Sequence, residues 1–308
     1  MRREAATVAG LLDDTTARIA AALGLAHRDA RLDARVLAAH VLGTDTAWLI
    51  AHDTDPLADT HVAAFESLLL RRLDGVPIAY LVGTREFYGR PFRVTPDVLI
   101  PRPDTELLVE RALACIPSDQ AVDVLDLGTG SGCIAITLAL ERPLARVAAV
   151  DRSTAALAIA RRNADILNAH IEFLTSDWFA ALAGRRFDLI VSNPPYVAAA
   201  DPHLARGDVR FEPLTALAAG HDGLDDLRRL IRAACDHLKP GGALLLEHGY
   251  DQADAVIELL RQHGFEQTCT LRDLGGLNRV SGGRRPGGVG RACGYTCADV
   301  LPVINDDS

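Results

Sequence analysis

The chain has 308 residues, of which 49% are hydrophobic and 24% are charged. These values are typical of a globular enzyme with a large core, and the length allows a catalytic domain with a smaller companion. The formal net charge of −9 argues against an extended nucleic-acid surface, which usually needs a clustered basic face. The same charge suits a basic protein partner.

The sequence predicts neither a targeting signal nor a membrane-spanning segment. Residues 1–23 include Asp13 and Asp14 and no apolar core before a cleavage site, so we predict no signal peptide. No stretch approaches the roughly 20 apolar residues needed to span a bilayer. The six cysteines lack framework spacing, which indicates a reducing compartment without disulfides. We therefore expect a cytoplasmic protein that makes no membrane contact.

The first part of the sequence, residues 1–78, predicts helices only. Three segments carry apolar residues at helical spacing: residues 7–23, 29–42 and 56–73. The third ends before the helix breakers Gly75 and Pro77. Because each such helix has one apolar face to bury, we expect a small helical bundle.

The residue pattern changes at residues 79–100, and this segment predicts a β-hairpin that links two domains. Tyr80-Leu81-Val82 and the later run Phe87-Tyr88 are strand formers, and glycines and prolines punctuate the segment.

From residue 101 onward, strands and helices alternate. Strands are predicted at residues 122–127, 146–150, 171–174, 187–191 and 243–247, and helices at 107–116, 133–140 and 155–167. Nearly continuous apolar strands between amphipathic helices indicate an α/β domain, whose parallel sheet is covered on both faces, over residues 101–285. Residues 281–308 are rich in glycine and end in Asn-Asp-Asp-Ser, so we expect them to be largely disordered, with a tail at 286–308.

A glycine loop follows the first strand of this domain. The run Asp126-Leu127-Gly128-Thr129-Gly130-Ser131-Gly132 ends the strand and opens a helix. Glycines at alternate positions allow a sharp turn and a close approach of a ligand. The N–H groups at the start of the helix favour a carboxylate or phosphate. A tight turn without any ligand is the alternative.

Two further features follow the next two strands. Asp151 comes directly after the second strand, where a carboxylate can accept hydrogen bonds from ribose hydroxyls. Asp177 and Trp178 follow the third strand, where Asp177 could accept from an adenine amino group and Trp178 could cover the ring. A core position is the alternative for Trp178. The pattern resembles class I S-adenosylmethionine-dependent methyltransferases, which implies that cofactor and a Rossmann-like, mostly parallel seven-stranded sheet.

The fourth strand runs into Asn193-Pro194-Pro195-Tyr196. Two prolines stiffen this segment and leave its carbonyls free to accept hydrogen bonds. The nitrogen of a planar amide or aryl amine is a weak nucleophile. The Asn193 side-chain oxygen and the Pro194 carbonyl could hold its two N–H groups so that the lone pair faces a methyl donor. Tyr196 could stack on the planar group.

The reaction that this tetrapeptide suggests needs no general base before attack, because a proton can leave after methyl transfer. A rigid turn after a strand is the alternative interpretation. The same tetrapeptide also resembles that of DNA adenine and RNA guanine methyltransferases, so the substrate must be inferred from other segments.

Several other segments are informative about the substrate: residues 80–89 (YLVGTREFYG), 99–106 (LIPRPDTE), 211–213 (FEP), 223–224 (GL) and 273–280 (DLGGLNRV). Together with the helical N-terminal domain, they closely resemble the bacterial peptide chain release factor glutamine N5-methyltransferases over about residues 7–285. The resemblance implies methylation of the glutamine in the Gly-Gly-Gln loop of class I release factors. The tail beyond Arg285 departs from the family.

The resemblance also implies roles for single residues. Asn193 and Pro194 would hold the glutamine amide. The glycine loop, Asp151, Trp178 and Asn193 would contact the cofactor, and the helical domain and hairpin would help to dock the release factor.

Other polar residues give weaker signals. Arg102 and Thr105 precede a helix whose first N–H groups could meet the methionine carboxylate of the cofactor, or the helix could simply be well capped. Glu212 could face the substrate entrance or form a buried structural pair. We predict no zinc at Cys293 and Cys297, because no further ligands stand beside them.

Three other functions are compatible with parts of the sequence. One is glutamine methylation of a ribosomal protein, and another is methylation of an amino group in DNA or RNA, against which the negative charge argues. The third is a cofactor-binding protein without catalysis, against which the intact Asn193-Pro194-Pro195-Tyr196 segment argues.

Overall fold

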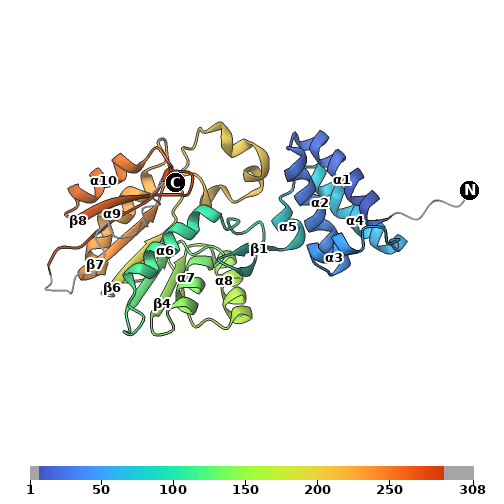
Figure 1. The fold of residues 1–308 in the computed structure, drawn as a ribbon. Helices are drawn as coiled ribbons and strands as arrows, with labels where there is room; N and C mark the ends of the chain where they lie inside the picture. Colours follow the sequence, from blue (N-terminus) through green and yellow to red (C-terminus); the bar gives the residue numbers. More distant parts are fainter. Residues whose placement is uncertain (1–6, 288–308) are drawn as a thin grey trace, which may run out of the picture. The chain divides into compact units, whose positions relative to one another are not determined.

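The computed structural model describes residues 7–287. Its contacts divide into two compact units (Figure 1). Among the described residues, the helical unit comprises residues 7–84 together with Val94–Pro96 and Ala205–Glu212, and the sheet unit comprises Arg85–Arg93, Asp97–Leu204 and residues 213–287. No helix within residues 7–287 is long and apolar enough to cross a membrane.

The helical unit confirms the helices predicted near the N-terminus and adds two short ones. Its helices are α1 (Val8–Leu23), α2 (His27–Leu42), α3 (Thr46–Ala51), α4 (Asp59–Leu73) and α5 (Ile78–Val82). The Thr7 hydroxyl accepts from the Gly10 N–H at 3.2 Å and caps α1. The apolar faces of the helices meet in one core, which includes Ile19, Leu37 and Leu69.

The hairpin is shorter than the sequence predicted. It consists of β1 (Thr84–Phe87) and β2 (Arg90–Arg93), whereas residues 80–82 belong to α5. Proline at the N-cap and Gly83 at φ 75° set the ends of α5, and Leu81 packs into the helical core. A short apolar run is ambiguous between strand and helix until its packing partners are known, which explains the error.

A buried arginine on α4 ties a distant segment to the helical unit. Arg72 is only 4% exposed, and its guanidinium donates to Asp33 and Asp208, each at 2.8 Å. Arg210 adds a bond to the Asp74 carbonyl at 2.8 Å. Burial raises the pKa of Asp33, and the charge of Arg72 opposes this rise. Residues 205–212 are therefore held on the helical unit by hydrogen bonds of charged side chains. The sequence pattern did not predict this attachment.

We expect Arg72→Met to destabilise the helical unit by about 3 kcal/mol, because Asp33 would remain as a poorly hydrated charge without its partner. Arg18→Met is the matched control. Its pair with Glu66 is about one-third exposed on the arginine side, so its loss should cost less than about 1 kcal/mol. Urea unfolding followed by circular dichroism measures both values, and equal losses would contradict the assignment.

The sheet unit confirms the predicted fold class. Its strands are β3 (Asp123–Leu127), β4 (Arg146–Asp151), β5 (Glu172–Thr175), β6 (Phe187–Ser192), β7 (Leu238–Glu247), β8 (Glu266–Arg272) and β9 (Asn278–Arg284). They form one seven-stranded sheet of order β5-β4-β3-β6-β7-β9-β8. The four pairs from β5 to β7 are parallel, and β9 is antiparallel to both of its neighbours.

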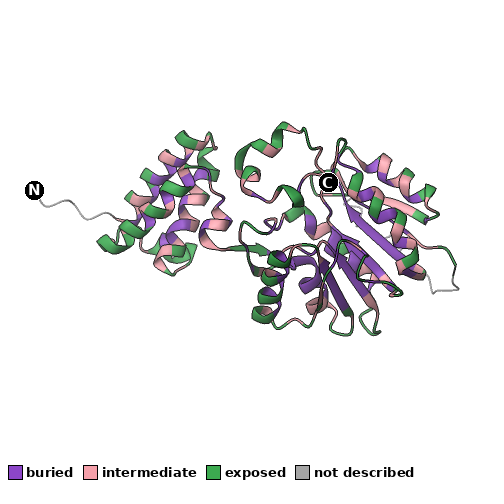
Figure 2. Ribbon diagram, turned by 180° about the vertical axis from the view of Figure 1, so that it is seen from behind, coloured by how far each residue is buried: buried purple, intermediate pink, exposed green. Residues whose placement is uncertain are grey.

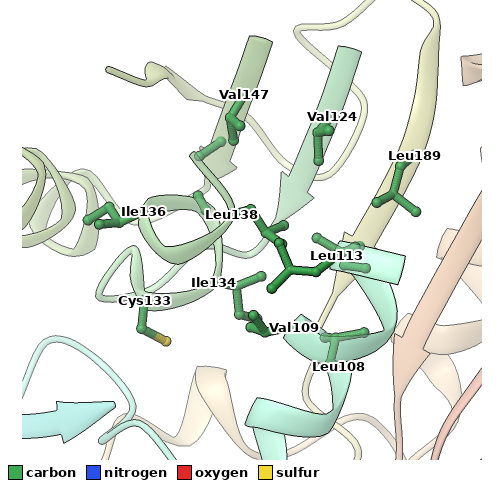
Figure 3. Close-up of a cluster of buried hydrophobic side chains, with 14 of the residues drawn as sticks. Leu108, Val109, Leu113, Val124, Cys133, Ile134, Ile136, Leu138, Val147 and Leu189 are labelled. Atoms are coloured by element: carbon green, nitrogen blue, oxygen red, sulfur yellow. The ribbon is translucent and has the colours of Figure 1, made fainter. Parts of the chain in front are cut away.

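Helices cover both faces of this sheet. On one face lie α6 (Glu106–Cys115), α7 (Cys133–Glu141) and α8 (Thr154–Leu167), and on the other lie α9 (Asp225–His237) and α10 (Ala253–Gln262). Figure 3 shows Leu108, Val109 and Leu113 of α6 gathered with side chains of α7 and the central strands. In Figure 2 the central strands are purple, that is, buried, whereas the covering helices carry exposed faces.

The glycines near residue 282 have a packing role rather than the disorder that we predicted for residues 281–308. Ser281 to Arg284 lie within β9, which pairs with β7 and β8. A Cβ at Gly282 would stand 2.4 Å from the Leu244 carbonyl, so only glycine fits this close approach. Residues 288–308 of the predicted tail lie outside the described residues.

Candidate functional site

The glycine loop connects β3 to α7 in the way that the sequence predicted. The N–H groups of Gly128 and Thr129 both donate to the Val150 carbonyl at 2.9 Å, which holds the loop at the end of β4. Gly128 has φ 72°, and a Cβ placed there would lie 3.3 Å from the Trp178 ring. The loop backbone is therefore close to an aromatic ring from another strand end.

Asp126 is fully buried beneath this loop. Its Oδ2 accepts from the Thr129 hydroxyl at 2.7 Å, and its Oδ1 has no partner among the described residues. Burial raises the pKa of Asp126 to about 7, while the Thr129 hydrogen bond lowers it. The side chain thus helps to shape the loop from below.

Asp151 stands at the end of β4, directly beside the loop. Its two carboxylate oxygens accept from the Gly130 N–H at 2.9 Å and from the Ser153 N–H at 2.8 Å. Each carboxylate oxygen has a second lone pair, so hydroxyl donors can still bind there. The predicted contact with ribose hydroxyls is compatible with this geometry.

Trp178 has a positive φ of 51°, which is uncommon for a residue with a side chain. Its indole Nε1 donates to Asp226 of α9 at 3.2 Å, and its ring lies against Gly128. The carboxylate of Asp177 is paired with Arg229 at 2.9 Å, and both side chains are about half exposed. Trp178 is thus held beside the loop, whereas the Asp177 carboxylate is engaged on the surface.

The segment that follows β6 begins immediately beside the glycine loop. In the parallel register Ser192 pairs with Leu127, and the Ser192 hydroxyl donates to the Leu127 carbonyl at 2.7 Å. The next side chain, Asn193, donates from Nδ2 to the Thr105 hydroxyl at 3.1 Å. Among residues 7–287, no donor reaches Asn193 Oδ1 or the buried Pro194 carbonyl.

Tyr196 is fastened at both its backbone and its hydroxyl. Its carbonyl accepts from Gln252 Nε2 at 2.9 Å, and its hydroxyl donates to Glu247 Oε1 at 3.2 Å. Burial raises the pKa of the Tyr196 phenol, and the nearby charge of Arg102 lowers it. Arg102 is therefore close enough to Tyr196 to act on it electrostatically.

Arg102 and Glu212, both predicted to contact the substrate, belong to different units of the structure. Arg102 precedes the 3₁₀ turn Pro103–Thr105, which leads into α6 within the sheet unit. Glu212, only 4% exposed, belongs with residues 205–212 to the helical unit. The predicted role of Glu212 at a substrate entrance stays a prediction. Cys293 and Cys297 lie outside the described residues.

Two residues of this site escaped the sequence reasoning. Glu247, at the end of β7, is 1% exposed, and burial raises its pKa to about 7. Asp226, on α9, receives the Trp178 indole N–H. Position at the carboxyl end of a parallel strand could have pointed to Glu247. Nothing local marks Asp226 among the many acidic residues at helix starts.

The ends of β3, β4 and β6 thus place a glycine loop, a carboxylate and two unoccupied hydrogen-bond acceptors on one edge of the sheet. The loop, Asp151 and Trp178 fit a ligand that has ribose hydroxyls and a flat ring. The acceptors at Asn193 and Pro194 directly follow β6, the strand next to β3 in the sheet. This arrangement suits a nucleoside cofactor next to a bound amide or amine.

Comparisons with known proteins agree with this geometry. The chain matches the family models of the PrmC N-terminal domain at residues 11–83 and of the methyltransferase small domain at residues 103–207. The release factor glutamine methyltransferase of Bordetella pertussis is 56% identical over 254 residues, 82% of this chain and 94% of that protein. Its counterpart in Escherichia coli K12 is 49% identical over 257 residues, 82% of this chain and 92% of that protein.

A similar fold occurs in the crystal structure of a methyltransferase from Pyrococcus furiosus. The TM-score is 0.51 at 18% sequence identity, and the match covers 72% of this chain and 98% of that one. Fold, loop and family match together define an S-adenosylmethionine-dependent methyltransferase of class I. Within this class, the chain belongs to the release factor glutamine methyltransferase family.

We expect Gly128→Ala to weaken S-adenosylmethionine binding at least about tenfold, because the new methyl group meets the Trp178 ring at a backbone φ that alanine disfavours. Gly184→Ala is the matched control. Gly184 has a φ of 75° and open space around it, so the mutation adds the backbone strain without the ring contact. Isothermal titration calorimetry measures both affinities, and equal weakening would contradict a binding role for this loop.

The stability of the free protein should fall as the pH rises through about 7. Asp126 has a folded-state pKa of about 7 against an ordinary value near 4, so its proton stabilises the folded state and is lost in this range. Asp126→Asn should reduce the slope of Tm with pH between 5 and 8, and Glu247, whose pKa burial also raises to about 7, should account for a remaining slope.

Asp123→Asn is the control for this measurement, because the pKa of Asp123 is lowered to about 2 and the group stays ionised throughout this range. Its Tm can change, but its slope with pH should not. An unchanged slope in Asp126→Asn would contradict the assigned titration.

Proposed function

We propose that this enzyme transfers a methyl group to the side-chain amide nitrogen of a glutamine in a protein, namely the Gly-Gly-Gln glutamine of class I peptide chain release factors. The observation that carries the proposal is the orientation of Asn193. Its Nδ2 donates to Thr105, which leaves the side-chain oxygen Oδ1 available to accept from a substrate, as the backbone carbonyl of the next residue, Pro194, could also do. Family membership supports the choice of substrate.

These two acceptors act on a nitrogen that is a poor nucleophile. When bound, S-adenosylmethionine supplies a methyl group on a positively charged sulfur. Asn193 Oδ1 and the Pro194 carbonyl accept the two N–H bonds of the glutamine amide and turn its lone pair toward this methyl carbon. They also stabilise the positive charge that develops on nitrogen during attack. The N–C bond forms as the C–S bond breaks, and the extra proton then passes to water.

Other residues hold the two reactants in place. Asp151 would bind the ribose hydroxyls, Trp178 would cover the adenine ring, and the glycine loop would approach the cofactor closely. Asp126 supports the loop from below through Thr129. Tyr196 and Pro195 would pack against the flat amide. Arg102, on the sheet unit, and Glu212, on the helical unit, would each contact the protein substrate.

The partner and the compartment follow from this substrate. A release factor acts in translation, so we place the enzyme in the cytoplasm. The helical unit and the hairpin would dock the release factor. A net charge of −9 is compatible with a basic protein partner and disfavours direct binding of nucleic acid.

Asn193→Ala should reduce methyl transfer to a release factor at least about 100-fold, because the amide loses one of its two orienting acceptors. The affinity for S-adenosylmethionine should stay within about threefold. The assay uses purified release factor and labelled cofactor, and peptide mass spectrometry locates the methyl group. Asn168→Gly, which keeps the left-handed cap of α8 (φ 56°), is the control and should retain full activity.

Full-rate methylation by the Asn193→Ala variant would refute the assignment of this site. Ribosomal proteins, DNA and RNA are tested in parallel. Preferential methylation of any of these, with an inert release factor, would replace the substrate proposed above. Tight cofactor binding without turnover on any protein would instead support a non-catalytic role.

A further inference from the structure

A partly open cavity lies in the sheet unit, between α6 and the antiparallel strands at one end of the sheet. Its volume of about 310 Å³ is at the lower end of the range for cavities that bind small molecules. Arg111 and Cys115, one turn apart on α6, line one side of it, and residues of β7, β8 and β9 line the other. All lining residues belong to the sheet unit, so the cavity is a feature of this unit alone.

The strand register explains which residues face this cavity. Leu245 of β7 pairs with Gly282 of β9, and Gly282 pairs with Cys269 of β8. Ala243 pairs with Arg284 in the next row of the same face. Ala243 and Leu245 belong to the core cluster that contains the apolar side chains of α6, so these rows lie under α6. The sheet thus contributes an apolar surface and one arginine to the cavity.

A bulge in β8 adds polar side chains to the lining. The register of β8 with β9 shifts between Glu266 and Cys269, where β8 has one extra residue. Gln267 and Thr268 both line the cavity, although successive residues of a regular strand face opposite sides. The Thr268 hydroxyl accepts from Arg261 Nε at 3.3 Å, so its own proton remains available to a ligand. The bulge therefore provides hydrogen-bond donors.

The charge of the cavity is positive. Arg111 and Arg284 line it, and none of its lining residues is an aspartate or a glutamate. Arg284 Nη1 donates to the Gly241 carbonyl at 2.8 Å, which is a neutral partner. The chain as a whole has 41 acidic and 32 basic residues, so two arginines without a carboxylate depart from the overall balance. A cavity of this kind attracts anions.

The two buried arginines of residues 7–287, Arg72 and Arg111, differ in their partners. Arg72 pairs with the carboxylates of Asp33 and Asp208. Arg111 is 8% exposed, and no group within the same residue range forms a hydrogen bond with its buried Nε or Nη1. A guanidinium cannot lose its charge in a protein, and a buried charge without a partner is strongly unfavourable. Water could accept these N–H bonds but would leave the charge unbalanced, whereas an anion does both.

We propose that this cavity binds a small organic anion, whose carboxylate or phosphate group pairs with the Arg111 guanidinium. The parallel N–H groups of a guanidinium match either anionic group in a bidentate arrangement. Gln267 and Thr268 provide further donors from β8. Ala243 and Leu245 contact the apolar part of the ligand, which favours an organic anion over inorganic phosphate.

The proposed anion site is separate from Asn193 and Pro194, although α6 and β7 extend to both places. Arg111 lies six residues beyond Thr105 along α6, a rise of about 9 Å. Ala243 lies four residues before the end of β7, a distance of about 13 Å. The bound anion is therefore neither the methyl donor nor the amide substrate, and this proposal does not depend on the proposed methyl transfer.

Isothermal titration calorimetry at constant ionic strength tests the site with three probes, namely hexanoate, hexyl phosphate and inorganic phosphate. We expect at least one organic probe to bind at least tenfold more tightly than inorganic phosphate, and the tighter of the two identifies the preferred anionic group. Saturating S-adenosylmethionine should change its affinity less than twofold. Equal binding of inorganic phosphate would contradict the organic class of ligand, and competition by S-adenosylmethionine would place the probe in the cofactor site instead.

Arg111→Leu should weaken binding of the tighter probe at least 20-fold, because the cavity loses its unpaired charge. Arg232→Leu is the matched control, since it removes the same charge from an exposed position of α9 on the other face of the sheet, and its affinity should stay within twofold. Thr268→Val keeps the side-chain shape without the hydroxyl and should weaken binding at least threefold. Wild-type affinity in Arg111→Leu would overturn the proposal.

Thermal unfolding gives a second readout and shows whether Arg111→Leu is folded. Without a probe, the Tm of Arg111→Leu should equal or exceed that of the wild type, because the variant buries no unpaired charge. A saturating probe should raise the Tm of the wild type by at least about 3 °C and that of Arg111→Leu by less than about 1 °C. A much lower Tm of Arg111→Leu without a probe would show that the protein itself balances this charge and would reject the anion site.

Discussion

The parallel pairing of β3 with β6 is the constraint on which the site depends. It sets Leu127 beside Ser192, and the Ser192 hydroxyl locks the two strand ends together at 2.7 Å. The chain then leaves the sheet twice at the same edge, once as the glycine loop and once as residues 193–196. A slip of one residue would turn every buried side chain to the wrong face, so the packing of both sheet faces protects this register.

Two buried carboxyl groups lie near this edge of the sheet, although burial of a carboxyl group without full hydrogen bonding costs free energy. Asp126 and Glu247 are almost fully buried, and burial raises the pKa of both to about 7. Each accepts a hydrogen bond from a hydroxyl group, Asp126 from Thr129 and Glu247 from Tyr196. Hydrogen bonds of this kind fix the directions of groups around a site, which loose apolar packing cannot do. The burial of the apolar faces of α6 to α10 against the sheet offsets the free-energy cost of burying these two carboxyl groups.

Local sequence patterns predicted the strands and helices correctly where the spacing of apolar residues fits only one type of element. The apolar runs of β3, β4 and β6 and the glycines of the loop identified the α/β domain and its binding edge. The prediction failed at residues 80–82, where the same apolar residues fit a strand or a helix, and at residues 281–284, where the glycines allow close pairing with β7. In both segments the secondary structure depends on the element against which the segment packs. A local sequence pattern does not contain that information.

The sequence by itself determined the chemical groups of the site: the glycine loop, Asp151, and Asn193 followed by two prolines. Their functions follow from residue type and from position at a strand end. Only the tertiary structure decided how Asn193 is oriented, because Thr105 lies 88 residues away along the chain, and what anchors Tyr196, because Glu247 lies 51 residues away. Hydrogen bonds between such distant residues form only after the strands and helices have packed, so no local sequence pattern records them.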